Sequence, residues 1–517
     1  MGARGGIYRA RVTARRMPYR VTEVESTPAR TPALVVVAIM VVLSLTVLDA
    51  TVVYVAYPVI MGSLGATIDE VAWISTAYLL GAVIVLPLVG FLEARMGRKA
   101  LFLTAATAFL LASAACAFAQ DVGTLALARA VQGIGGGMLQ PLGQACLFDA
   151  YPGERRSHAQ VLLGWGLMIG PAIGPVIGGL LLTYASWPWI FLINVPLGSI
   201  AIVILWRGLP NATERPAAAP FAFVPFAAMA LGFAALVNFL QRISDVGFDD
   251  PTIVLSLIAM FVCIPYFIIS QIVAARPMMD LSLFRFASFR SGNIVAIFGS
   301  PAVTGVSFLA TGFCEQVLGL NPLTTAWLQV PAVPATLIGL TAAPRLTRRF
   351  GAPRVMAGGL VGVAISALLF ASLTARNPFI DVGYLRFLGG VTVGLLFVPL
   401  GLWTLRDVTQ RAGAHAASTI ALVRQMAAGV AIATVTGLIV HGTAAAHARA
   451  AEQIDAARPQ VRSVLANAAV RRQYLAHIDN AARDAGYQDA FLFAAIASFC
   501  VVPLLFVRGR HEASKAG

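Results

Sequence analysis

Two charged side chains lie deep in apolar sequence, where a charge is costly. Asp49 falls inside the apolar run 33–58, and Arg129 falls inside the run 122–150. On membrane-insertion scales a charge at the centre of an apolar helix costs about 2.5–3.5 kcal/mol, so Asp49 must take up a proton, pair or face water. A carboxyl group in this setting is suited to bind and release protons. The structural alternative is an aspartate held by a neighbouring hydroxyl such as that of Thr51.

Arg129 poses a different problem, because a guanidinium group keeps its proton in proteins. It must pair with an acid, face water or bond backbone carbonyls. We therefore predict that Arg129 either sets the protonation of a carboxylate or organises a proton path. Its alternative role is simpler: a long side chain that extends to the membrane interface.

Further polar and aromatic side chains are candidates to line a substrate cavity. These candidates are Tyr54, Tyr57, Gln132 and Glu315. The two tyrosines also fit plain packing. Glu315 ends one apolar run and Arg424 opens another, so both also fit positions at a membrane interface.

The composition identifies the class of protein that must position these residues. Hydrophobic residues make up 58% of the chain and charged residues only 12%, which excludes a soluble globular protein. Repeated apolar runs of about 18 or more residues predict an all-α polytopic membrane protein. The five cysteines form no close pair and the six histidines no H-E-x-x-H pattern, so we expect no disulfide framework, metal site or cofactor. No hydrolase motif is present either, and we do not expect an enzyme.

Fourteen membrane spans fit the apolar runs. They are 33–58, 71–92, 99–119, 122–150, 158–183, 188–206, 220–241, 251–274, 288–314, 324–345, 353–374, 379–402, 413–441 and 490–507. Lysine and arginine concentrate in the short loops on the side of the N-terminus, whereas the short loops opposite hold only Arg242 and Arg376. Both termini are therefore expected in the cytoplasm of a cell with the protein in its plasma (inner) membrane. This asymmetry accounts for much of the +14 net charge without a nucleic-acid partner.

An internal repeat divides the chain. The basic loop around Gly97 recurs around Gly351, 254 residues later, and Arg129 recurs as Arg386, 257 residues later. Two offsets that agree within three residues predict parallel halves of six spans each. The expected organisation is a cytoplasmic tail (1–32), a first half (33–206), a linker with two extra spans (207–287), a second half (288–507) with an outer loop (442–490), and a second cytoplasmic tail (508–517).

The fifth span has an unusual distribution of glycine and proline. Its marked residues are Gly170, Pro171, Gly174, Pro175, Gly178 and Gly179. Glycines four residues apart share one helix face, against which another helix packs closely, and the prolines are expected to bend the span. A moving part and simple tight packing both fit this pattern. The outer loop 442–490 is alanine-rich with charges of both signs, which favours a solvated helical hairpin over a docking surface.

These segments together resemble the major facilitator superfamily, and specifically its 14-span drug/proton antiporter branch of EmrB/QacA-type multidrug efflux permeases. The segments 48–58, 125–137, 166–179, 189–198 and 277–285 are similar to motifs of that branch. A cytoplasmic loop motif is formed by Gly90, Glu93, Arg95, Gly97, Arg98 and Lys99. Four positions depart from the pattern: Ala94 replaces the usual aspartate of the loop, Tyr54 and Tyr57 replace asparagine and leucine, and Pro188 replaces an arginine.

The resemblance implies transport by alternating access, in which the two halves rock about a central cavity. It implies export of amphipathic organic compounds, often cationic or aromatic, in exchange for protons, with Asp49 and Arg129 carrying the coupling. It also implies a possible periplasmic adaptor and outer-membrane channel as partners, through the segment 442–490. The alternative is a transporter of one metabolite, nutrient or siderophore; a non-transporting sensor is the least favoured.

Overall fold

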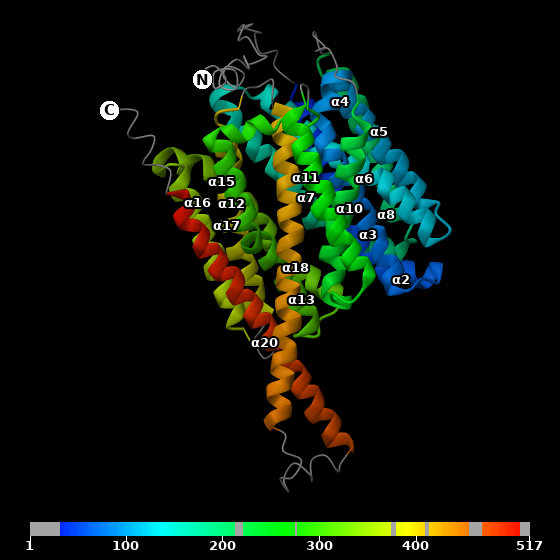
Figure 1. Ribbon diagram of the computed structural model, residues 1–517, viewed down its shortest axis with the longest axis vertical. Coiled ribbons are helices and arrows are strands. Elements are labelled where there is room, and N and C mark those ends of the chain that lie inside the picture. The colour runs from blue at the N-terminus through cyan, green and yellow to red at the C-terminus, as the bar shows by residue number, and fades with distance from the viewer. Residues whose placement is uncertain are drawn as a thin grey trace, which may run out of the picture. The chain divides into compact units, whose positions relative to one another are not determined.

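The computed structural model describes residues 32–211, 221–274, 277–373, 379–408, 413–453 and 468–506. These residues belong to the unit Thr31–Gly517. The predicted tails, part of the linker and residues 454–467 of the predicted outer loop lie outside the described residues. Every regular element in the described ranges is a helix (Figure 1), as predicted for an all-α membrane protein.

The helices follow one another with short connections. The first group is α2 (Ala33–Leu64), α3 (Ile68–Val85), η1 (Leu86–Leu88), α4 (Val89–Met96), α5 (Arg98–Ala117), α6 (Val122–Ala150), η2 (Gly153–Arg155), α7 (Arg156–Tyr184), α8 (Trp189–Leu192) and α9 (Asn194–Gly208). Next come α10 (Phe223–Val246) and α11 (Pro251–Val273). The last group is η3 (Leu281–Arg285), α12 (Ala287–Ser300), the π-helical turn η4 (Pro301–Gly305), α13 (Val306–Gln316), α14 (Pro322–Gln329), α15 (Ala332–Phe350), α16 (Ala352–Ala371), α17 (Phe379–Thr404), α18 (Gly413–Gln453), α20 (Ala468–Val501) and η6 (Val502–Leu505).

Twelve described segments are long and apolar enough to cross a membrane. Helices α6 and α7, each 29 residues long, are not among these twelve. At 1.5 Å per residue, each nevertheless measures about 44 Å, more than the thickness of a hydrocarbon core. Because α7 runs unbroken from Arg156 to Tyr184, its two prolines do not end the helix.

Polar residues at helix starts supply the hydrogen bonds that the first turn lacks. Thr67 and Glu70 form a capping box on α3, in which the Thr67 N–H donates to Glu70 at 2.8 Å. This N–H, followed by the Thr67 hydroxyl, holds the pKa of Glu70 below its ordinary value. Asp121 and Thr124 form a second capping box on α6. These polar turns end the apolar runs and thereby fix where the spans begin.

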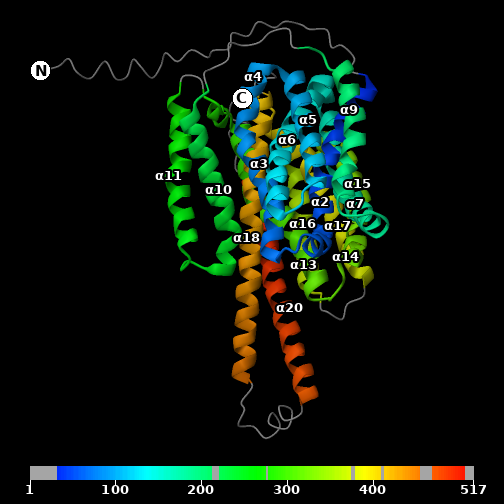
Figure 2. The ribbon, with the colours of Figure 1, turned by 90° about the vertical axis from the view of Figure 1, so that its right-hand side faces the viewer.

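Packing within each predicted half is extensive. In the first, α2 packs on α7 and α9, and α6 packs on α3 and α5. In the second, α17 packs on α15 and α16, and α20 packs on α16 and α18. Helices α10 and α11 pack mainly on each other, and α10 also contacts α3 and α18 (Figure 2). The two extra helices are therefore peripheral additions to the bundle.

Two helices connect the groups. Helix α7 contacts α14, α15 and α17, while α18 contacts α4, η1 and α6. In the predicted repeat α7 and α18 are the fifth helices of their halves, so each packs across onto the other half in an equivalent way. These two helices therefore supply much of the contact between the predicted halves.

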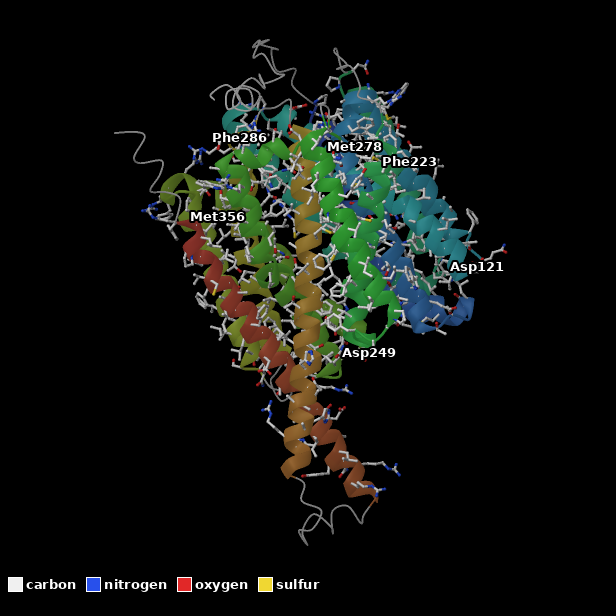
Figure 3. The ribbon with its side chains drawn as sticks, viewed as in Figure 1. Asp121, Phe223, Asp249, Met278, Phe286 and Met356 are labelled. Carbon is white, nitrogen blue, oxygen red and sulfur yellow. The ribbon has the colours of Figure 1, made fainter. Side chains whose placement is uncertain are left out.

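Helices α18 and α20 extend beyond the ends of neighbouring helices (Figures 1 and 2). The predicted outer loop 442–490 is helical over its described residues, since α18 continues to Gln453 and α20 already begins at Ala468. Hydropathy placed the last span at 490–507 because it registers apolar residues, whereas an alanine-rich polar segment also continues a helix. In Figure 3, Asp121 and Asp249 of predicted outer loops lie toward the end where these helices project, and Met278 and Phe286 lie toward the other.

Candidate functional site

The structure brings Asp49 and Arg129 together in the interior of the first half. Asp49 comes from the middle of α2 and Arg129 from the second turn of α6, and each is only 1% exposed. Arg129 Nη1 donates to Asp49 Oδ2, forming an ion pair. The two residues singled out by their charge in apolar sequence are therefore direct partners.

Two amides complete the surroundings of the carboxylate. Gln132 Nε2 and Asn194 Nδ2 donate to Asp49 Oδ1 at 2.9 and 2.8 Å. Arg129 Nη1 also donates to Gln132 Oε1 at 2.7 Å. Gln132 and Asn194 are fully buried. Three donors from α6 and α9 thus converge on one buried carboxylate.

A second layer holds these groups in place. Asn194 Nδ2 donates to Ser113 Oγ at 3.0 Å, and Ser113 Oγ donates to the Phe191 carbonyl at 2.9 Å. The Arg129 guanidinium lies over the Tyr78 ring at 4.4 Å and the Phe191 ring at 5.7 Å. Two polar atoms stay without a hydrogen bond among the described residues, Arg129 Nε and Asn194 Oδ1. The cluster is rigid on the side of α5 and α9 and incomplete at these two atoms.

Thr51 does not hold the aspartate. Its hydroxyl donates to carbonyls of its own helix, at 2.9 Å to Leu48 and 3.1 Å to Val47. The structural alternative considered for Asp49 is therefore replaced by the ion pair with Arg129.

The fifth-span glycines lie directly against the turn that carries Asp49. A Cβ on Gly170 would come within 2.6 Å of the Leu48 amide nitrogen, and one on Gly174 within 2.3 Å of Thr51 Oγ1. A Cβ on Gly178 would be 3.1 Å from Val52. Close packing of α7 on α2 is thus the observed role of this face. The side chains of Pro171 and Pro175 lie outside those that the structure describes, and no such contact is described for Gly179.

The remaining cavity candidates do not gather at this cluster. The Tyr57 hydroxyl donates to Ser75 Oγ at 2.5 Å, and the ring packs against an apolar cluster at the far end of α2. Glu315 is exposed on α13 in the other half. The side chain of Tyr54 lies outside the described ones. Among the candidates whose side chains are described, Gln132 contacts Asp49.

The loop motif forms a second polar cluster at the other end of the first half. Arg98 Nε donates to Glu93 Oε1 at 2.6 Å, and Arg98 Nη1 pairs with Asp149. Glu93 thus supplies a charge pair although Ala94 occupies the usual aspartate position. A Cβ on Gly90 would lie 2.2 Å from His415 Nδ1, so α4 and α18 touch here. Gly97 has a φ of 83°, which glycine tolerates best, and Arg95 and Lys99 make no hydrogen bond within the described residues.

Sequence reasoning missed part of the cluster. Asn194, Ser113 and Tyr78 carried no signal beyond being polar or aromatic in an apolar run. Asn194 was noted in a motif-like segment without a role, and its isolation in the run 188–206 was the available signal. As for metals, no group of three or more histidine, cysteine, aspartate or glutamate residues that could hold an ion occurs in the described ranges.

This architecture, with its buried ion pair, is that of a membrane transporter, and the family model of the Major Facilitator Superfamily matches residues 39–434. The chain belongs to that superfamily. The fatty acid resistance protein FarB of Neisseria gonorrhoeae is 31% identical over 477 residues, 89% of this chain and 93% of FarB. The putative multidrug resistance protein MdtD of Escherichia coli is 28% identical over 393 residues, covering 76% of this chain and 83% of MdtD. The solved structure of human MFSD10 (TETRAN) is similar in fold, with a TM-score of 0.62 at 14% identity over 92% of this chain and 99% of that one.

Proposed function

We propose that the protein is a proton-coupled exporter of amphipathic organic compounds. The observation that carries this proposal is the buried Asp49–Arg129 pair, held by Gln132 and Asn194 and packed against α7. A buried ion pair is weak evidence for stability, because its desolvation cost offsets much of the attraction. Its retention inside a membrane helix bundle is better explained by a cycle in which the pair forms and breaks.

The proposed cycle starts from a proton that reaches the Asp49 carboxylate from outside. Protonation neutralises the acid, so the attraction of Arg129 for it is lost and the contacts around α2 and α6 rearrange. Because α7 packs on α2 through its glycines and on α15 and α17 of the other half, a shift at Asp49 is transmitted across the two halves. Release of the proton inside restores the ion pair, and the substrate leaves outside.

Relatives support the substrate class. FarB is named for fatty acid resistance and MdtD for multidrug resistance, and both names fit the export of compounds with a large apolar part. We extend the proposal to the arrangement in the membrane. Helices α6 and α7 also cross the membrane, which gives the fourteen spans of the drug/proton antiporter branch. The two halves are 33–206 and 288–507, and both termini lie in the cytoplasm. The helical extensions of α18 and α20 would then project from the outer face toward an adaptor and an outer-membrane channel.

Substrate-induced proton release tests the coupling. Purified protein is reconstituted into vesicles that contain a pH-sensitive dye, and wild type is compared with Asp49→Asn. The variant mimics the protonated acid but cannot ionise, so we expect substrate-induced proton movement to fall at least about 100-fold. Asp249→Asn, which alters an exposed acid near the end of α10, is the matched control and should behave as wild type.

Proton release by Asp49→Asn at the wild-type rate would place the proton carrier elsewhere, with Glu315 the next acid to test. Wild-type vesicles that move substrate without protons would instead reject coupled export. Uptake of substrate that rises with expression in energised cells would favour the import of a nutrient.

A further inference from the structure

Arg424 is a second cation in the interior of the bundle, and it lies in the other half. Its guanidinium lies over the Phe397 ring of α17 at 5.3 Å. The side chain is partly buried on α18, eleven residues after the first residue of that helix. It forms no hydrogen bond or ion pair with any residue that the structure describes. A contact with a benzene ring compensates a buried charge far less than an anion does.

The surroundings of Phe397 place this cation between the two halves. Phe397 packs against the apolar core of the first half and against the cluster of Leu340, Ala343 and Val398 in the second. Trp165 of α7 packs against the same cluster, and its buried indole N–H has no acceptor among the described residues. The Arg424 guanidinium and the Trp165 indole N–H thus lie beside the same apolar cluster at the junction of the two halves, and neither has an acceptor among the described residues.

A small cavity lies at the end that holds the loop motif, and the charged side chains of Arg98, Asp149 and Arg156 are part of its lining. Its lining includes Gln144 and Phe148 of α6, Leu405 after α17, and Gly413 and Ala417 of α18. Ala417 and Arg424 are seven residues apart, so they share one face of α18 two turns apart. Phe397 and Gly401 of α17 and Leu405 just after it are likewise four residues apart. The cavity and Arg424 therefore lie at successive levels along α17 and α18.

Between these levels lies a pair of amides. Gln144 Nε2 donates to Gln160 Oε1 at 3.3 Å, and Gln160 packs on Gly401, where a Cβ would lie 2.5 Å from its Nε2. An amide pair is uncharged and can exchange its hydrogen bond for one to a passing polar group. Uncharged amides that a ligand can displace thus lie between the level of the cavity and the level of Arg424.

From these observations we infer that Arg424 binds the anionic headgroup of an amphipathic substrate, whose apolar chain lies against Phe397 and the cluster at the junction of the halves. This inference rests on the proposed export function and narrows its substrates to anions, whereas the resemblance implies amphipathic compounds that are often cationic or aromatic. Asp49 and Arg129 neutralise each other, whereas Arg424, at the junction of the halves, has no counter-charge among the described residues.

Two probes with permanent charges and the same chain test the inference: decanesulfonate and decyltrimethylammonium. Proton-driven uptake of each radiolabelled probe is measured in inside-out vesicles with the full chain. Wild type should transport decanesulfonate. Arg424→Gln should lower that rate at least about tenfold, as expected when a charge-assisted hydrogen bond is lost, whereas Arg424→Lys should retain most of it. Arg207→Gln, at the exposed end of α9, is the matched control.

Arg424→Glu separates a loss of binding from a loss of folding. This variant reverses the charge, and we expect the preference to shift from decanesulfonate to decyltrimethylammonium, a gain that misfolding cannot produce. Unchanged decanesulfonate transport in Arg424→Gln would overturn the inference. So would a wild type that transports only decyltrimethylammonium, although export itself would then stand. A wild type that transports neither probe, nor any substrate in the proton-release assay, would overturn the proposed function and the inference with it.

Discussion

The two halves carry equivalent arginines in unequal surroundings. Arg129 lies seven residues after Val122, the first residue of α6, and Arg386 lies seven residues after Phe379, the first residue of α17. Arg129 pairs with Asp49, whereas the positions 254 to 257 residues after Asp49 are Val303 to Val306, which include no acid. Arg386 is partly buried, and its Nε has no hydrogen-bond partner among the described residues.

The two halves thus share their helix packing but differ in the charged groups that they contain. Both helices pack closely on their neighbours through glycines, as Gly133 does on Tyr78 and Gly390 on Ala332. Among the described residues, the arginine of the first half pairs with an acid and the arginine of the second half does not. The second half contributes unpaired positive charge, at Arg386 within it and at Arg424 on its face toward the first half. We therefore expect substitutions in the two halves to affect coupling and substrate choice differently.

The largest contrast is expected between Arg129→Gln and Arg386→Gln. Removing Arg129 leaves the buried Asp49 without its counter-charge, which costs about 3–5 kcal/mol unless the acid takes up a proton. Removing Arg386 leaves no acid unpaired and should change stability by less than about 1 kcal/mol. Thermal unfolding in detergent measures the stability, and substrate-induced proton release measures the coupling. Equal losses of stability and of proton release in the two variants would show that both arginines take part in the coupling.

A smaller effect on stability, with a strong effect on transport, is expected for Gly174→Leu. The added side chain would press on Thr51, two residues from Asp49, and overpacking of this kind costs about 1–3 kcal/mol. Membrane insertion should persist while transport is lost. Gly437→Leu on α18 is the control, since no atom outside its own helix turns lies within 4 Å of its added Cβ. Normal efflux by Gly174→Leu would show that the glycine face of α7 serves packing alone.

Asn194→Ala should have an intermediate effect on coupling. It removes one of three donors to the Asp49 carboxylate, and hydrogen bonds to charged groups contribute about 1.5–3 kcal/mol. The Asp49 carboxylate would keep two donors, Arg129 and Gln132, so substrate-induced proton release should fall about tenfold, less than in Arg129→Gln. The vesicle assay with the pH-sensitive dye checks this. Proton release at the wild-type rate would show that Asn194 only positions α9.

The smallest effect is expected at the outer hairpin. His447 Nε2 lies 3.3 Å from Asp479 Oδ1, and both side chains are 42% exposed. Exposed ion pairs contribute about 0–1 kcal/mol, so His447→Ala should leave both stability and vesicle transport within experimental error. A loss of transport in the reconstituted protein would show that α18 and α20 couple to the transport cycle.

Much of this architecture could be predicted from local sequence. Apolar runs predicted the class and most helix positions, since a membrane helix is defined by length and hydropathy over a continuous stretch. Asp49 and Arg129 were identifiable because a charge in such a run needs a compensating partner. The glycines four residues apart predicted a close helix contact, which α7 makes with α2. The extent of α20 was underestimated, because its first turns are polar yet rich in residues that favour helix.

The sequence by itself determined that the chain is an all-helical membrane protein, where its charges are costly and which helix face is open to close packing, because each of these follows from neighbours along the chain. Only the tertiary structure decided that Gln132 and Asn194 share the Asp49 carboxylate and that Thr51 does not. It also decided that Arg424 lies on Phe397 at the junction of the halves. Such contacts join helices that are 80 to 145 residues apart, as Arg129 and Asn194 are from Asp49, and only the packing of the bundle sets which side chains meet.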